Sequence, residues 1–139
     1  MRKAIIVSGY FNPLHKGHLE LFEKAKSQGN ILIVIVNSDK QRYLKGSKVF
    51  MLEDERLTIV EAIKYVDLAI ISVDITGTQI KTLEHLHNKY KDIYELAFAN
   101  GGDQDNTSIP EAKICNELGI ELIDGLGSKI QSSSWLINK

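Results

Sequence analysis

Short aliphatic runs alternate along this chain with segments whose apolar residues recur every three or four positions. The runs cover residues 4–7, 31–36, 68–71, 96–99 and 120–123. Several of them are apolar at every position, as expected for strands of a parallel sheet that is buried on both faces. The pattern therefore predicts five strands.

The segments between the runs predict helices. Apolar residues at 19, 22 and 25 form the first stripe, and Gly29 is placed to end that helix. Further stripes at 57, 60 and 63, and at 80, 83, 86 and 90, predict two more helices. The acidic residues 53–55 suit the N-terminus of the second helix, because the helix dipole is positive there.

Two more helices are predicted in the last third of the chain. Ser108 and Glu111 have the spacing of a capping box at the start of a fourth helix, and Gly119 is placed to end it. The serines at 132–134 predict the start of a short last helix.

Strand–helix alternation of this kind predicts a doubly wound α/β fold, a three-layer α/β/α sandwich around a five-stranded parallel sheet with right-handed crossovers. The length of 139 residues fits a single domain over residues 1–139. Ligands of such sheets bind beyond the carboxyl ends of the strands. Candidate chemistry is therefore sought in the residues that follow each strand.

Composition narrows the classes of function. The formal net charge of −1 argues against a nucleic-acid coat protein. The longest aliphatic run has six residues, far from the ~20 that a membrane span needs, so no membrane partner is expected. The lone Cys115, expected to be buried on the fourth helix, indicates a reducing, cytoplasmic environment.

The first strand leads into the segment Gly9-Tyr10-Phe11-Asn12-Pro13-Leu14-His15-Lys16-Gly17-His18. Gly9 allows a close backbone approach, and Asn12-Pro13 is a turn signal. His15 and His18 then stand at a predicted helix N-terminus, where free N–H groups and the helix dipole favour an anion. Two imidazoles at that place can donate hydrogen bonds to phosphate oxygens as negative charge builds during a displacement.

Two other readings of the histidine pair stay open. His15 and His18 could bind a transition metal for hydrolysis with an acid such as Glu20, although the sequence offers no compelling third ligand. Alternatively, the chain could be a non-catalytic nucleotide-binding sensor. His85 and His87 are expected on a helix surface, and Trp135 in the core or at an interface.

The segment after the second strand is basic and long. Four basic residues (Lys40, Arg42, Lys45 and Lys48) stand against one acid, Asp39, in a connection of about fifteen residues. A basic segment at the ligand edge of the sheet could close over a polyphosphate and neutralise a leaving group.

Two later segments also fit a phosphate or nucleotide ligand. Gly101, Gly102 and Asp103 follow the fourth strand, where paired glycines leave backbone amides uncovered and the acid can take an amino group, a hydroxyl or a cation. Ser132, Ser133 and Ser134 stand at a predicted helix start, where hydroxyls and free amides can bind phosphate or simply cap the helix.

Taken together, these motifs resemble the cytidylyltransferase-like nucleotidyltransferase superfamily, over about residues 1–136. The segment 15–18 matches its H-x-G-H signature, and 9–13 looks like its G-x-F-[DN]-P lead-in. Residues 37–46 are similar to the adenylyltransferase domains of bacterial heptose-phosphate activation, and 131–134 to the superfamily's I-S-[ST]-[ST] motif. Asn100 replaces a frequent lysine or methionine. Only Lys129 stands where glycerol-phosphate cytidylyltransferases carry an R-T-x-G arginine.

The resemblance implies a Rossmann-like fold and transfer of a nucleotidyl group. The nucleoside triphosphate would be CTP or, as the alternative, ATP, and the acceptor a small phosphorylated alcohol or a sugar phosphate. Mg²⁺ would be held mainly by the triphosphate, with no metal site made by protein side chains, and a homodimer is common among such proteins. The implied catalytic residues are His15, His18 and Lys45; Asn12 and Lys48 would bind the substrate. The implied nucleotide-binding residues are Gly9, Tyr10, Phe11, Arg56, Gly102, Asp103, Ser132, Ser133 and Ser134.

Overall fold

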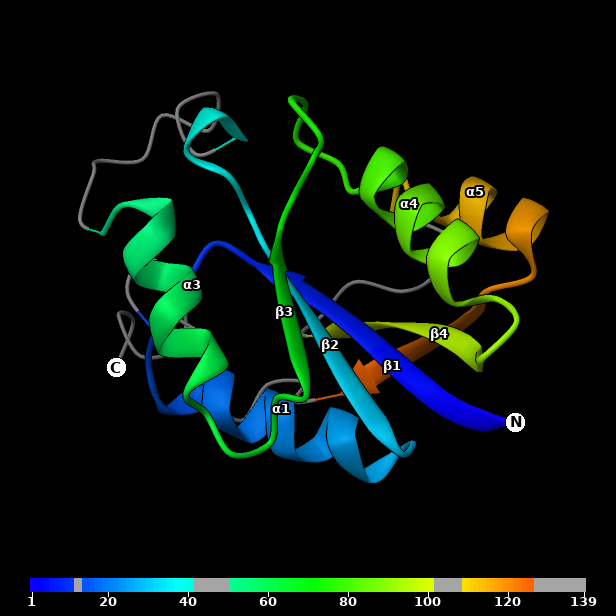
Figure 1. The fold of residues 1–139 in the computed structure, drawn as a ribbon, viewed down its shortest axis with the longest axis horizontal. Coiled ribbons are helices and arrows are strands. Elements are labelled where there is room, and N and C mark those ends of the chain that lie inside the picture. Colours follow the sequence, from blue (N-terminus) through cyan, green and yellow to red (C-terminus); the bar gives the residue numbers. More distant parts are fainter. Residues whose placement is uncertain (12–13, 42–50, 102–108, 127–139) are drawn as a thin grey trace.

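The computed structural model describes residues 1–11, 14–41, 51–101 and 109–126, with only the backbone of residues 100, 101 and 124–126 (Figure 1). Strands and helices alternate along the described chain. In order they are β1 (Arg2–Gly9), α1 (Lys16–Ser27), β2 (Ile31–Val36), α3 (Glu53–Glu61), β3 (Leu68–Ile71), α4 (Ile80–Tyr90), β4 (Tyr94–Gly101), α5 (Ala112–Leu118) and β5 (Glu121–Leu126).

The five strands form one parallel sheet in the order β3-β2-β1-β4-β5, which confirms the predicted Rossmann-like α/β fold. β1 lies at the centre and pairs with β2 on one side and β4 on the other. The chain first winds outward from β1 to β3 and then returns to β4. The switch point therefore lies between the carboxyl ends of β1 and β4, where such sheets bind ligands.

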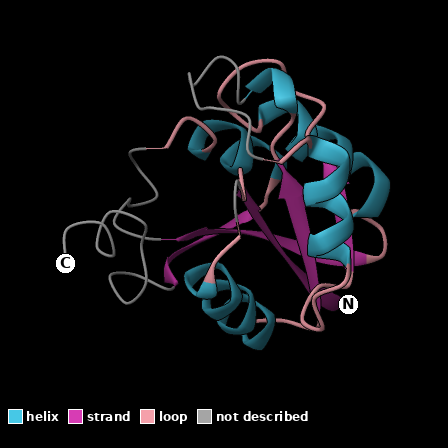
Figure 2. Ribbon diagram, turned by 90° about the vertical axis from the view of Figure 1, so that its left-hand side faces the viewer, coloured by secondary structure: helices cyan, strands magenta, loops and turns pink. Residues whose placement is uncertain are grey.

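Alternate residues of each strand pack into two separate cores. On β1, Ile5 and Val7 face the core that α1 and α3 cover, while Ala4 and Ile6 face the core under α4 and α5. Figure 1 shows the two helix pairs on opposite sides of the sheet, and Figure 2 shows the strands between helices. Because both faces are covered, the strands are apolar at successive positions, as the sequence indicates.

The fourth predicted helix needs a correction. The helix begins at Ala112, with Glu111 as N-cap in helical conformation and no side-chain cap hydrogen bond. Glu111 is therefore the N-cap and not the third residue of the helix, and its carboxylate accepts the backbone N–H of Gln79 at 2.8 Å. Ser108 lies outside the described residues.

Cys115 is fully buried in the core under α4 and α5, as predicted. Burial, followed by the charge of Glu111, raises the pKa of its thiol to about 12, so the side chain is an inert apolar group at neutral pH. Among the described residues, no helix combines the length and the apolar character that crossing a bilayer requires.

Candidate active site

His15 and His18 form the N-terminus of α1, just beyond the carboxyl end of β1. His15 is the N-cap in extended conformation, and its Nδ1 accepts the backbone N–H of Gly17 at 3.0 Å. The Nδ1 of His18 in turn accepts the backbone N–H of His15 at 3.0 Å. The two imidazoles thus make the reciprocal hydrogen bonds of a capping box, in which Ser or Thr and Glu or Gln are usual.

These hydrogen bonds fix both rings. The ring centroids lie 3.9 Å apart with the planes 29° from parallel, so the imidazoles are stacked. Because each Nδ1 accepts a backbone N–H, the hydrogen-bond pattern assigns the proton of each neutral ring to Nε2. The pair therefore presents two Nε2–H donors at a helix N-terminus whose first turn carries no acidic side chain.

His18 is neutral at physiological pH. Burial, and secondly the neighbouring His15, lower its pKa from 6.5 to about 4. A neutral imidazole does not attract an anion by charge, but its Nε2–H is a well-oriented donor. The site thus has the form of a fixed hydrogen-bond donor aimed at negative charge, as in oxyanion holes.

Phe11 connects β1 to the histidine pair through an unusual backbone conformation. Its φ is 54°, the only positive φ of a non-glycine residue in the described chain. Such a conformation costs about 1–3 kcal/mol and persists only where the surroundings enforce it. The Phe11 ring is buried edge-on against His18 at 5.0 Å and Phe22 at 5.4 Å. It occupies the space beside Gly9, where a Cβ would lie 2.7 Å from the ring.

Arg56 lies behind the backbone that leads to the histidine pair. Its side chain is fully buried, and its guanidinium is bonded to the protein instead of facing a ligand space. Nε donates to Met51 O at 3.0 Å, and Nη1 donates to both Tyr10 O and Asn37 O at 2.7 Å. Nη2 donates to the Asp39 carboxylate at 2.8 Å. The guanidinium is thus held by the protein on several sides, and the nucleotide-binding role that the resemblance implies for Arg56 stays a prediction.

Asp39 and Glu53 bind each other across the base of the basic segment. The Asp39 N–H donates to the Glu53 carboxylate at 2.7 Å, and the Glu53 N–H donates to the Asp39 carboxylate at 3.2 Å. Asp39 thus caps the start of α3 while it neutralises Arg56. The two residues bring together the chain on either side of residues 42–50.

A buried group of amides at the same edge of the sheet escaped the sequence analysis. Asn37 directly follows β2, and its Oδ1 accepts Nε2 of Gln79, the N-cap of α4, at 3.1 Å. Gln79 Oε1 is buried and meets no hydrogen-bond partner in the described part of the chain. In the sequence, only the position of Asn37 at the end of a strand indicates that this residue could belong to a site. The sequence around Gln79 gives no such indication.

The remaining predicted site residues lie outside the described residues. They are Asn12, Lys45, Lys48, Gly102, Asp103, Ser132, Ser133 and Ser134. Asn100 is described by its backbone alone, as the last residue but one of β4. Of the predicted set, the structure therefore brings together Gly9, Tyr10, Phe11, His15 and His18, with Arg56 behind the Tyr10 carbonyl.

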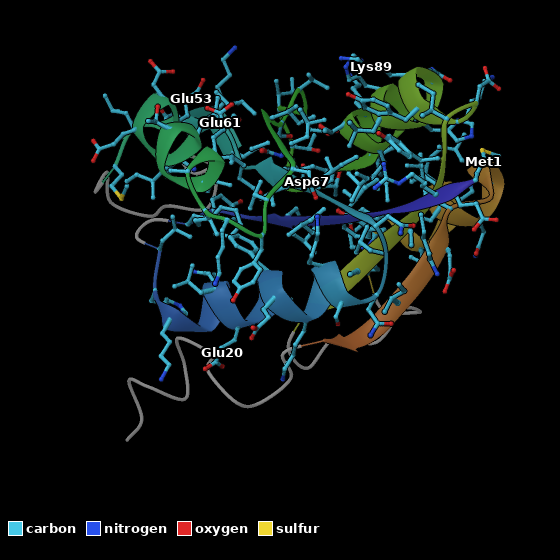
Figure 3. The ribbon with its side chains drawn as sticks, turned by 60° about the horizontal axis from the view of Figure 1, so that its bottom comes forward. Met1, Glu20, Glu53, Glu61, Asp67 and Lys89 are labelled. Atoms are coloured by element: carbon cyan, nitrogen blue, oxygen red, sulfur yellow. The ribbon has the colours of Figure 1, made fainter. Side chains whose placement is uncertain are left out.

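The described residues offer the metal-hydrolase alternative no third ligand. They contain no group of three His, Cys, Asp or Glu side chains arranged to hold a metal ion. Both Nδ1 atoms of the histidine pair are occupied by backbone N–H groups. Figure 3 shows Glu20 on the outer side of α1, pointing away from the sheet.

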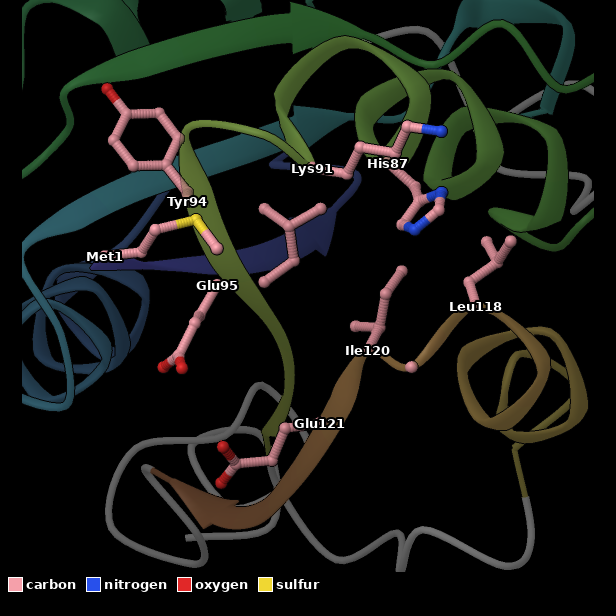
Figure 4. A pocket seen from close by; sticks show the side chains of 10 residues that line it. Met1, His87, Lys91, Tyr94, Glu95, Leu118, Ile120 and Glu121 are labelled. Atoms are coloured by element: carbon pink, nitrogen blue, oxygen red, sulfur yellow. The ribbon is translucent and has the colours of Figure 1, made fainter.

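A pocket of about 360 Å³ lies at the opposite, amino edge of the sheet (Figure 4). Glu95, Glu121 and Lys91 line it, and Glu121 is paired with Lys3 at 2.8 Å. His87, expected on a helix surface, lines the pocket and is half-buried, whereas His85 is exposed. The pocket is thus distinct from the histidine site.

The sequence is similar to several named proteins of other organisms. It is 30% identical to the FAD synthase of Picrophilus torridus over 137 residues, covering 94% of this chain and 90% of that one. It is 37% identical to the glycerol-3-phosphate cytidylyltransferase of Staphylococcus aureus over 68 residues, covering 49% and 52%. It is 28% identical to the bifunctional protein HldE of Pelobacter propionicus, covering 99% of this chain and 25% of HldE.

The fold is shared with a solved structure, the lipopolysaccharide core biosynthesis protein of Thermoplasma volcanium. The TM-score is 0.71 at 22% identity, covering 89% of this chain and 96% of the other. Residues 6–124 match the cytidylyltransferase-like family, a span that begins within β1, ends within β5 and contains the histidine pair. The sheet, the paired imidazoles at the entrance of α1 and this match agree: the chain belongs to the cytidylyltransferase-like family and is a nucleotidyltransferase.

Proposed function

We propose that the chain transfers a CMP or AMP group from a nucleoside triphosphate to a small phosphorylated alcohol or sugar. An acceptor phosphate oxygen attacks the α-phosphorus in line. The new O–Pα bond forms as the bond from Pα to the bridging oxygen of the β-phosphate breaks, and pyrophosphate leaves with that electron pair. The acceptor phosphate is already anionic near neutral pH, so no general base is needed.

The observation that carries this proposal is the fixed imidazole pair at the N-terminus of α1. Nε2–H of His18, with that of His15, donates to the nonbridging oxygens of the α-phosphate as their charge increases. The backbone N–H groups of residues 9–11 and the positive end of the α1 dipole support the phosphates. Positioning and charge stabilisation then account for catalysis without a covalent intermediate.

The proposal assigns the remaining roles to residues that the structure does not describe. Lys45, helped by Lys48, draws charge from the β- and γ-phosphates, and Asn12 and Lys48 bind the acceptor. The rest of the nucleotide pocket consists of Gly102, Asp103, Ser132, Ser133 and Ser134. Mg²⁺ would be held mainly by the triphosphate and by water, and would supply positive charge to the phosphates. A cytoplasmic homodimer completes the proposal.

Adenylyl transfer is a second candidate with its own support. The match includes 90% of the length of the relative named FAD synthase, but only 52% of the length of the glycerol-3-phosphate cytidylyltransferase. FAD contains an AMP unit joined to a phosphorylated alcohol, so the chemical class of acceptor is the same. The nucleobase is therefore the first property to measure.

A thermal-shift panel of CTP, ATP, GTP and UTP with Mg²⁺ tests the nucleotide. A nucleotide at 100 times its dissociation constant stabilises the fold by about 2.7 kcal/mol, which separates the true substrate from weak binders. A pyrophosphate-release screen over phosphorylated alcohols and sugars then identifies the acceptor. Release with none of them would favour the nucleotide-sensor alternative.

His18→Ala tests the catalytic assignment. The variant loses a transition-state donor, so turnover should fall by at least about two orders of magnitude while the fold survives. Circular dichroism and the melting temperature confirm folding, and pyrophosphate release measures turnover. Near-normal turnover of the folded variant would refute the role of the histidine pair.

A further inference from the structure

Arg56 is the only Lys or Arg among the described residues that is buried, with 0% of its side chain exposed. A guanidinium removed from water loses a large hydration energy, which it must recover from hydrogen bonds and an anionic partner. It has both here. Its place in the fold, behind the backbone that leads to the histidine pair, indicates what it does.

We propose that Arg56 is a positioning residue that orients the Tyr10–Phe11 peptide toward the nucleotide phosphates. The inference rests on the proposed function. In this arrangement Arg56 touches no phosphate. It acts through the peptide that lies between it and the ligand.

The geometry of one peptide group carries the proposal. Arg56 Nη1 donates to Tyr10 O at 2.7 Å. Because a trans peptide is planar, its N–H points opposite to its carbonyl, so the Phe11 N–H points away from Arg56. No described residue accepts that N–H. The φ of 54° at Phe11 then turns the chain toward His15 and His18.

The positive charge adds to this orientation. A cation bonded to a carbonyl polarises the whole amide and makes its N–H a stronger donor. Asp39 holds the guanidinium from one end, at 2.8 Å, while the carbonyls of Asn37 and Met51 hold it from two other directions. The Arg56 guanidinium therefore has little freedom to rotate away from the Tyr10 carbonyl.

The planar fork explains why arginine is required at this position. Three carbonyls and a carboxylate surround the side chain and take donors from Nε, Nη1 and Nη2. A lysine ammonium carries the charge but has only three donors on one atom, so it cannot reach all four acceptors. Arg56→Lys thus keeps the positive charge at this position but loses part of the hydrogen-bond geometry of the guanidinium.

Kinetics of pyrophosphate release with Arg56→Lys and Arg56→Met test the proposal. A misplaced Phe11 N–H stabilises the transition state less, because negative charge builds on the phosphate oxygens there. We therefore expect kcat to fall about 10- to 100-fold while KM for the triphosphate changes less than about threefold. Leu86→Ala is the matched control, since Leu86 lies on the buried side of α4, in the core on the opposite face of the sheet. It should lower the melting temperature but leave kcat unchanged.

A second readout does not depend on turnover. Inorganic pyrophosphate should shift the Phe11 amide resonance in ¹H–¹⁵N spectra of the wild-type chain and of Leu86→Ala. In Arg56→Lys the shift should be less than half as large. If wild-type protein releases no pyrophosphate with any acceptor, the proposed function fails, and the Phe11 resonance still decides the role of Arg56.

Asp39→Asn covers the case in which both Arg56 variants fail to fold. It keeps the guanidinium but removes the charge that orients it, so kcat should fall about three- to tenfold and the Phe11 shift should diminish. Three outcomes would each overturn the proposal. The first is a folded Arg56→Lys with wild-type kcat, and the second is a Phe11 resonance of the wild-type chain that does not shift when pyrophosphate is added. The third is an Asp39→Asn variant whose kcat and Phe11 shift both equal those of the wild type.

Discussion

Gly9 leaves the space that the Phe11 ring occupies beside the histidine pair. A Cβ at Gly9 would lie 2.7 Å from two carbons of that ring, closer than real contacts allow. The ring cannot yield easily, because Phe22 and His18 pack against it. We predict that Gly9→Ala destabilises the fold by about 1–3 kcal/mol, as overpacked cores do. Turnover should fall at least about tenfold because the ring displaces His18.

Gly77→Ala provides the control for this prediction. No atom lies within 4 Å of a Cβ built at Gly77, so the added methyl group meets open space. Urea unfolding and pyrophosphate release should both stay near wild type. If Gly9→Ala matched Gly77→Ala in both measurements, the Phe11 ring would not be fixing His18.

At the residue scale, sequence identified side chains that act close to their own position in the chain. The segment 9–18 could be recognised because the residues that share the site are also neighbours in sequence. The place of Arg56 could not be predicted, because three of its four acceptors are backbone carbonyls, of Tyr10, Asn37 and Met51. Any residue supplies a carbonyl, so side-chain identity carries no signal for such contacts.

At the scale of the element, His15 has two separable tasks at the start of α1. Its Nδ1 caps the helix by accepting the Gly17 N–H, and its Nε2–H belongs to the proposed phosphate site. Asparagine is among the best N-cap residues but has no imidazole. We predict that His15→Asn changes the free energy of unfolding by less than about 1 kcal/mol and lowers turnover about 100-fold.

His15→Ala is the comparison that separates the two tasks. It removes cap and donor together, so it should cost a further ~1 kcal/mol of stability relative to His15→Asn. Its turnover should be equally low. Turnover of His15→Asn close to wild type would mean that His15 is a helix cap and nothing more.

The strands were predicted within a few residues because continuous apolar runs are specific for buried parallel strands. The ends of the helices were harder to predict. α5 begins at Ala112, with Glu111 itself as the N-cap, and the Glu111 carboxylate accepts the Gln79 N–H, 32 residues earlier in the chain. A capping box is a local pattern, and it does not reveal such a distant partner.

Across the whole molecule, alternation of strands and helices was enough to predict the doubly wound sheet. It also predicts where a ligand should bind, beyond the carboxyl ends of β1 and β4, the switch point of the observed strand order. The pattern could not show which side chains connect the sheet to the layer of α4 and α5 at that edge. Asn37 and Gln79 make that connection with a side-chain hydrogen bond between the ends of β2 and α4. Such long-range pairs depend on tertiary packing, which local periodicity does not encode.

The stability of the whole fold should depend on pH through His18. Its pKa is about 4 in the folded chain and should be near 6.5 when the chain unfolds. Between these values the unfolded chain binds the proton more readily, so acid favours unfolding. Above pH ~7 both states are neutral at this ring and its contribution is constant. From pH ~7 to pH ~5 the free energy of unfolding should therefore fall by about 2 kcal/mol.

Urea unfolding of the wild type and of His18→Gln at these two pH values measures the effect. The variant has no titrating group at position 18, so its loss between pH ~7 and pH ~5 should be smaller by about 2 kcal/mol. Asp67 does not interfere: burial opposes its ionisation, but hydrogen bonds from Lys26 and Leu32 lower its pKa below the normal 3.8. Its stabilising contribution is therefore lost only in more acidic solution. Equal losses for the two proteins would mean that His18 is not buried as a neutral ring, and the fixed Nε2–H donor would lose its physical basis.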